Sequence, residues 1–238
     1  MDWRMIIFWV IAIALGLFAL FLFNGGDKKE ENNSIIRRMT VDAAFIAIII
    51  AMSFIPNFGY ITVAPGVSLT LIHIPVLLGC YLYGPKRGLI YGAAFGITSW
   101  IQANINPVGF NFFFIVPWVS VLPRLIFAFI AGLVFTIVKK NNKIYKSNLV
   151  VGALSLLLTL LHTILVFACL YIFYYSSISE MMASEISGAI VGTVAGVILV
   201  GAAGESVLSA ILIPLIGKAT RSFATKKRRQ HAEFQETS

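Results

Sequence analysis

Long, uninterrupted apolar runs constrain the fold of this chain more than any other feature does. Seven of them, each near the ~20 residues that a helix needs to cross a bilayer, account for most of the 238 residues. Continuous runs of this kind differ from the short alternating strands of a membrane barrel. The composition agrees, because 59% of the residues are hydrophobic and only 12% are charged. A soluble domain is about half apolar and a quarter charged. The sequence therefore predicts an all-α integral membrane protein.

The apolar runs divide the chain into three parts. They lie at 5–23, 41–56, 69–84, 89–105, 112–138, 148–174 and 187–217. We expect the last six runs to form a six-helix transmembrane bundle within a core domain over 35–222. The first run predicts one extra N-terminal transmembrane helix, which a polar linker joins to the core within 1–34. Residues 223–238 are predicted to form a basic tail.

The distribution of positive charge predicts how the bundle sits in the membrane. The formal net charge is +8, and Lys and Arg gather at 24–40, 85–88, 139–147 and from Lys218 onward. The intervening loops at 57–68, 105–111 and 175–186 contain neither residue. Because cytoplasmic loops carry the excess of positive charge, we expect a multi-pass cell-membrane protein with a cytoplasmic C-terminus. Short basic clusters between apolar runs form no continuous basic face, which argues against a nucleic-acid partner.

Small residues recur at every fourth position in three of the runs. The stripes are Ala43, Ala47 and Ala51; Gly88, Gly92 and Gly96; and Gly188, Gly192 and Gly196. Four-residue spacing keeps the small side chains on one face of a helix, where another backbone can approach closely. For the two glycine stripes we expect packing inside the bundle.

Few charged or titratable side chains fall within the apolar runs, and each is a functional candidate because a charge in hydrocarbon is costly. They are Arg124, Glu205, His73 and His162, with Asp42 near a membrane surface. Arg124 lies too deep to reach the surface easily and needs an anion. That anion is either Glu205, in a purely structural pair, or the carboxylate or phosphate of a substrate, or both in turn. Each histidine is either an interhelical hydrogen-bonding residue or a ligand contact.

Uncharged amides and aromatic residues gather near one end of the predicted bundle. They are Gln102, Asn104, Asn106, Asn111, Phe112, Phe113, Phe114 and Trp118. Most interfacial phenylalanines are membrane anchors, but the amides beside them suit a pocket that reads a small polar molecule through hydrogen bonds. The predicted substrate-binding set is therefore Arg124, Glu205, Gln102, Asn111, Trp118, His73 and His162. We predict no catalytic residue, no metal site and no cofactor.

Five segments, in this order, resemble the substrate-binding S components of energy-coupling factor (ECF) vitamin importers. They are Ser68–Gly79, Gly84–Gly88, Gly92–Ser99, Val119–Arg124 and Glu205 followed by Ala210–Pro214. The resemblance extends over roughly residues 36–222. It implies six helices around a pocket near the outer surface, with the loop after the first core helix acting as a lid. It also implies docking on a transmembrane coupling subunit driven by two ATPases.

In this family a small-residue motif on the first core helix meets the coupling subunit, and Ala43, Ala47 and Ala51 match that motif. The resemblance thus assigns the alanine stripe to an external partner. The chain contains no GxxxxGK[ST] loop, so ATP hydrolysis is expected from the other subunits. The expected function is that of a membrane-embedded, non-enzymatic subunit that binds a vitamin with a carboxylate, of the pantothenate type, through Arg124.

Several alternatives remain open at this point. Riboflavin, folate or a pyridoxine-type ring would use the aromatic belt. An intramembrane hydrolase built on His73, His162 and Glu205 would need a spacing such as HExxH or GxSxG, and neither occurs. The same three side chains, on different helices, are weak support for transport of a metal ion.

Overall fold

The structure is a computed structural model that describes the greater part of the predicted core. The described residues are 32–55, 58–64, 67–107, 109–141, 145, 147–183, 196, 199–220 and 222. The predicted N-terminal helix over 5–23 and the basic tail over 223–238 lie outside these residues. Predictions about them are therefore not tested by the structure.

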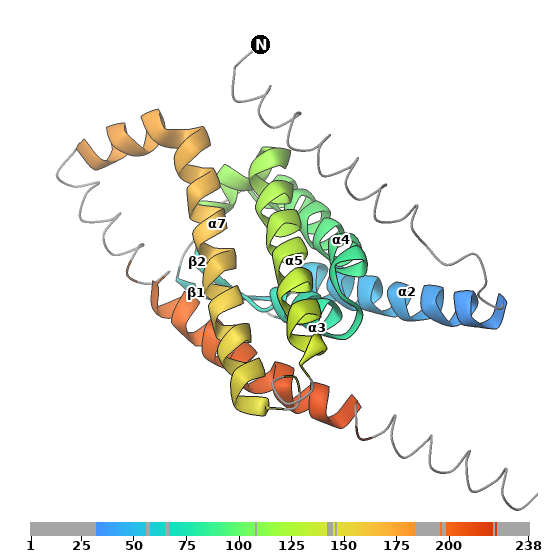
Figure 1. Ribbon diagram of the computed structural model, residues 1–238. Helices are drawn as coiled ribbons and strands as arrows, with labels where there is room; N and C mark the ends of the chain where they lie inside the picture. The colour runs from blue at the N-terminus through green and yellow to red at the C-terminus, as the bar shows by residue number, and fades with distance from the viewer. Residues whose placement is uncertain are drawn as a thin grey trace, which may run out of the picture.

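Three of the described helices are long and apolar enough to span a membrane. They are α5 (Pro117–Lys140), the Asn148–Tyr174 part of α7 (Asn148–Ala183), and a last helix, Leu199–Thr220. The chain bends within α7 at Tyr174, whose backbone angles are not helical. Figure 1 shows α5 and α7 side by side in the bundle. These three helices confirm the prediction of an apolar, mainly helical membrane protein.

Three further helices precede α5 in the sequence. They are α2 (Asn32–Phe54), the short α3 (His73–Tyr83) and α4 (Pro85–Ile105). Among the labelled helices, α4 and α5 make the most extensive contact. α2 instead leads away from the bundle at a steep angle (Figure 1). The turn from α3 into α4 is sharp because Gly84 adopts a φ of 80° and Pro85 starts the next helix.

The segment between α2 and α3 corrects the purely helical prediction. Strands β1 (Tyr60–Ala64) and β2 (Val67–Thr70) form an antiparallel hairpin there. The predicted loop over 57–68 thus contains paired strands, and the helix predicted from residue 69 begins only at His73. Residues with β-branched side chains occupy much of this short segment, and pairing within the hairpin satisfies their backbone groups locally.

The predicted span over 112–138 is also divided. Residues Gly109–Ile115 form the 3-10 helix η1, and α5 begins at Pro117. Proline is well suited to the first turn of a helix, where its missing N–H is not needed. The break places the aromatic side chains of η1 across the start of α5.

The glycine stripe of α4 packs against α5, as predicted. A Cβ placed on Gly92 would lie 2.6 Å from the Ala128 Cβ and 2.8 Å from the Arg124 carbonyl oxygen. Gly88 and Gly96 contact Ala128 and Val121 in the same way. For the third stripe, Gly188 and Gly192 lie outside the described residues. Nothing described lies within 4 Å of a Cβ placed on Gly196, so the packing predicted for this stripe is not observed there.

Candidate substrate-binding site

The backbone of α5 explains how Arg124 is held. Pro123 has no N–H, so the helix itself leaves the Val119 carbonyl without its usual donor. The Arg124 guanidinium occupies that position, because its Nη1 lies 3.2 Å from the Val119 oxygen and 2.8 Å from the Ser120 oxygen. Proline and arginine thus act together, and one edge of the guanidinium is fixed by its own helix.

The rest of the Arg124 side chain faces aromatic rings. Its guanidinium carbon lies 5.4 Å from the centre of the Phe95 ring and 4.8 Å from that of Phe114. The side chain is 5% exposed, and its Nε has no hydrogen-bond partner. Within the described part of the chain, no carboxylate lies at ion-pairing distance from this arginine. The structure therefore does not contain the Arg124–Glu205 pair that the sequence left open.

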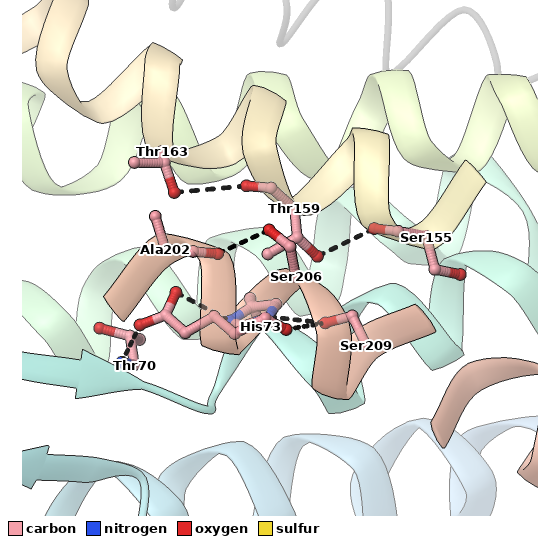
Figure 2. A network of polar contacts seen from close by, with 9 residues as sticks. Thr70, His73, Ser155, Thr159, Thr163, Ala202, Ser206 and Ser209 are labelled. Carbon is pink, nitrogen blue, oxygen red and sulfur yellow. Dashed lines mark hydrogen bonds and ion pairs between the residues drawn. The ribbon is translucent and has the colours of Figure 1, made fainter. Parts of the chain in front are cut away.

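Glu205 instead joins the last helix to the hairpin and to α3. The backbone N–H of Thr70, at the end of β2, donates a hydrogen bond to Glu205 Oε1. The second oxygen, Oε2, lies 4.0 Å from Nδ1 of His73. The other nitrogen of this imidazole, Nε2, lies 2.9 Å from the Ser209 hydroxyl. Figure 2 shows the labelled His73, Thr70 and Ser209 close together.

His162 of α7 lies between these two groups. Its ring stacks beside His73 with the ring centres 5.9 Å apart, and lies 5.7 Å from Phe95 and 4.9 Å from Phe127. The residue is 5% exposed, yet neither ring nitrogen has a hydrogen-bond partner. A buried imidazole with both nitrogens unsatisfied is costly unless a bound molecule or water completes it.

The hairpin adds one further side chain to this region. Tyr60, the first residue of β1, is close enough to Arg124 and Ser99 for both to influence its phenol. Burial raises the pKa of Tyr60, and this desolvation outweighs the opposing effects of Ser99 and of the Arg124 charge. The phenol is therefore neutral at physiological pH.

Buried polar atoms without a partner mark the extent of the candidate site. Among the described residues they are Tyr60 Oη, His73 Nδ1, Ser120 Oγ, Arg124 Nε, and Nδ1 and Nε2 of His162. They come from β1, α3, α5 and α7. Buried polar groups in native proteins are nearly always hydrogen-bonded, so this concentration favours a site for a polar ligand.

The remaining predicted contacts group where α4, η1 and α5 meet. The Gln102 carbonyl accepts the N–H of Asn106, and the Asn111 amide donates to the Asn106 carbonyl at 3.2 Å. Trp118 packs beside Phe173 of α7, with the ring centres 6.1 Å apart. This corner adjoins Arg124 through Phe114 of η1. The structure thus places His73 beside both Glu205 and His162, and places Gln102, Asn111 and Trp118 around η1 and the start of α5.

A line of buried hydroxyls continues from this site along α7 and the last helix. On α7, the Ser155, Thr159 and Thr163 side chains donate to the carbonyls four residues earlier. On the last helix, Ser206 donates to Ala202 and Ser209 donates to Glu205 in the same pattern (Figure 2). Each hydroxyl is thus satisfied within its own helix.

Sequence reasoning missed some residues that help to build the site. Ser209 lies four positions after Glu205, so the helical spacing was a usable signal. Tyr60 and Thr70 had none, because a hairpin was not expected. Among the described residues there is no group of three or more metal-ligating side chains.

The alanine stripe lies on another surface. Ala43 and Ala47 are exposed on α2, and Ala51 is half-buried. Large apolar side chains are exposed on the same helix, including Ile48 at 48% and Ile50 at 43%.

Apolar membrane-spanning helices around buried, unsatisfied polar groups define a membrane protein that binds a small molecule. The chain belongs to the family of ECF transporter substrate-specific components, whose model matches residues 37–217. Members of this family bind a vitamin and dock on a coupling subunit with its ATPases. The family is a class of transport subunits and not of enzymes, and the chain is therefore a vitamin-binding subunit of an ECF transporter.

The chain is similar in sequence to two pantothenate transporters and in fold to a solved S component. The chain is 28% identical over 166 residues to the pantothenic acid transporter PanT of Lactococcus lactis subsp. cremoris, covering 63% of this chain and 80% of that protein. It is 28% identical over 138 residues to the pantothenate transporter PanT of Leuconostoc mesenteroides, covering 56% and 67%. The crystal structure of an ECF-type S component for biotin superposes with a TM-score of 0.52 at 20% identity, covering 80% of this chain and 95% of that one. This last likeness concerns the fold alone.

Proposed function

We propose that this protein captures pantothenate, or a vitamin very like it, from outside the cell for an ECF importer. Arg124 carries the proposal, because it is a buried cation with an unpartnered Nε and no carboxylate at ion-pairing distance among the described residues. A ligand carboxylate would complete its hydrogen bonding and its charge. The two pantothenate transporters among the relatives support this choice of ligand.

The proposed ligand occupies the region between Arg124 and the His73–Glu205 pair. Its carboxylate binds Arg124, its body lies against the rings of Phe95 and His162, and the hairpin β1–β2 covers it as a lid. Gln102, Asn111 and Trp118 border the carboxylate end from the η1 corner. Riboflavin, folate and pyridoxine are the competing ligands, and they differ from pantothenate in carrying a large or aromatic ring.

The proposed architecture has six core helices over 35–222, one additional N-terminal helix over 5–23 and a cytoplasmic tail over 223–238. The basic loops face the cytoplasm, in keeping with the excess of positive charge in such loops. The exposed face of α2 with Ala43, Ala47 and Ala51 docks on the coupling subunit, which two ATPases drive. Small side chains allow close approach of a partner helix there.

The test compares two ligands on two arginine variants. Calorimetry on the purified full chain measures the affinity for pantothenate and for its alcohol analogue, in which a hydroxymethyl group replaces the carboxylate. In Arg124→Gln, we expect the affinity for pantothenate to fall by about one to two orders of magnitude, the range of a charge-assisted hydrogen bond. The affinity for the alcohol should change little.

Arg87→Gln is the matched control, because Arg87 pairs with Asp42 of α2 and not with the site. It should leave both affinities unchanged. Wild-type protein that binds the alcohol as tightly as pantothenate would exclude the role of Arg124. Tighter binding of riboflavin, folate or pyridoxine than of pantothenate would replace the proposed ligand.

A further inference from the structure

The two carboxylate oxygens of Glu205 have different surroundings. Oε1 accepts the backbone N–H of Thr70, so the carboxylate is held in place by the hairpin. Oε2 points toward His73 but lies 4.0 Å from Nδ1, which is too far for a hydrogen bond. The residue as a whole is 8% exposed.

The neighbouring serine determines which nitrogen of His73 carries the proton. The Ser209 hydroxyl donates to the Glu205 carbonyl at 3.0 Å, so its single hydrogen is already used. Its contact with His73 Nε2 at 2.9 Å therefore requires that Nε2 donate and the serine oxygen accept. In the neutral imidazole, Nδ1 then carries no hydrogen, and among the described residues, which include the nearby Thr70 backbone, none donates a hydrogen bond to it.

Oε2 of Glu205 and Nδ1 of His73 thus lie side by side, 4.0 Å apart, with no hydrogen bond between them. An ionised Glu205 would repel a ligand carboxylate placed beside this pair. A hydroxyl or amide N–H lying beside the pair would donate to Oε2 or Nδ1, and a ligand with two such donors would serve both. The cation Arg124 lies beyond the rings of Phe95 and His162, at the opposite end of the site.

We propose that Glu205 and His73 form a specificity subsite that selects hydroxyl groups at the end of the ligand remote from its carboxylate. This inference rests on the proposed function and adds to it a second requirement. The ligand must carry an anion at one end and hydrogen-bond donors at the other, with a body that fits beside two rings. Because the same carboxylate holds Thr70, a ligand hydroxyl on Oε2 also steadies the contact between the last helix and the hairpin lid.

The experiment measures the ratio of the affinities for two ligands, which is the preference of the protein for one over the other. Calorimetry compares pantothenate with an analogue that keeps its acyl chain, amide and carboxylate but lacks its two hydroxyls. Wild-type protein should prefer pantothenate by about tenfold or more. In Glu205→Gln the side-chain amide can donate a hydrogen bond to His73 Nδ1, which then no longer needs a donor from the ligand. The ratio of the two affinities should therefore fall to about threefold or less. Arg124→Gln should weaken both ligands and keep the preference.

Ser209→Ala gives a second, conservative route to the same test. Without this hydroxyl, the imidazole proton is free to move to Nδ1 and face Glu205, so the preference should again fall. Ser206→Ala is the matched control, because Ser206 donates to Ala202 on the same helix and should leave the preference intact.

The outcomes separate the two proposals. If wild-type protein binds neither compound, the proposed function fails. If it binds both equally well, the function stands and the hydroxyl subsite is wrong. The subsite is equally wrong if Glu205→Gln and Ser209→Ala both keep the wild-type preference.

Discussion

The Tyr91 hydroxyl donates a 2.5 Å hydrogen bond to the Asp42 carboxylate and so ties α4 to α2. The Arg87 guanidinium lies 3.5 Å from the same carboxylate, and the Phe45 ring stacks on Tyr91 with centres 5.0 Å apart. Because α2 leads away from the bundle (Figure 1), this group of contacts fixes how α2 is oriented relative to α4.

Removing the Tyr91 hydroxyl should loosen this connection. In Tyr91→Phe, Asp42 keeps Arg87 but loses its closest hydrogen-bond donor. We expect the free energy of unfolding to fall by about 1.5–3 kcal/mol, as for hydrogen bonds to charged groups. Thermal unfolding in detergent would measure the lower Tm. Tyr83→Phe is the control, since it keeps the ring over which Arg87 lies and should leave Tm nearly unchanged. Equal Tm values for the two variants would argue against the role of the Tyr91 hydrogen bond.

The close contact of Gly92 with α5 predicts a second effect. In Gly92→Ala the new methyl group would press on the Arg124 carbonyl and on Ala128, because there is no free space at this position. Overpacking of this kind lowers the free energy of unfolding by about 1–3 kcal/mol. Because it would also move Arg124, it should weaken the binding of pantothenate.

Gly204→Ala tests the specificity of that effect. Nothing described lies within 4 Å of a Cβ at Gly204, although it is next to Glu205. This change should raise stability by up to about 1 kcal/mol through helix propensity. A Tm for Gly92→Ala at or above that of the wild type would show that α4 and α5 are less tightly packed than the structure has them.

The alanine face of α2 can be blocked without touching the site. Ala47→Trp should leave pantothenate binding unchanged but prevent co-purification with the coupling subunit, because an indole keeps the partner helix at a distance. Ala153→Trp places the same bulk on an exposed position of α7 and should allow assembly. Normal assembly of Ala47→Trp would place the docking surface elsewhere.

Tyr60 should make the folded state sensitive to alkaline pH. The ordinary pKa of tyrosine is 10.0, and burial raises the pKa of Tyr60 above it in the folded protein. Above pH ~10 the unfolded chain therefore releases a proton that the folded chain retains, so stability falls as pH rises through this range. The Tm of the wild type should drop more steeply above pH 10 than that of Tyr60→Phe. Parallel curves would mean that this phenol is solvated.

Sequence patterns predicted those parts of the fold that depend on local periodicity. The α5 and α7 spans followed from apolar runs alone, and the four-residue spacing of Gly88, Gly92 and Gly96 correctly predicted close packing. The hairpin was missed because its two strands are short. A strand of so few residues shows too little alternation of apolar and polar side chains to be distinguished from a loop or a helix end.

The site was predicted as a set of residues but not as an arrangement. Charges at Arg124 and Glu205 had to be compensated, and the sequence alone could not decide whether they compensate each other. The answer depends on Pro123, which frees a carbonyl for Arg124, and on Thr70, which lies 135 positions from Glu205 and donates to it. Contacts over such a separation leave no local pattern.

The contact between Thr70 and Glu205 has a consequence for the life of the protein in the cell. Because Thr70 and Glu205 are 135 positions apart, a bound vitamin stabilises the folded bundle and not one local segment. Empty molecules open more often and are the ones that membrane proteases reach. The amount of this importer subunit should therefore rise and fall with the supply of the nutrient it collects.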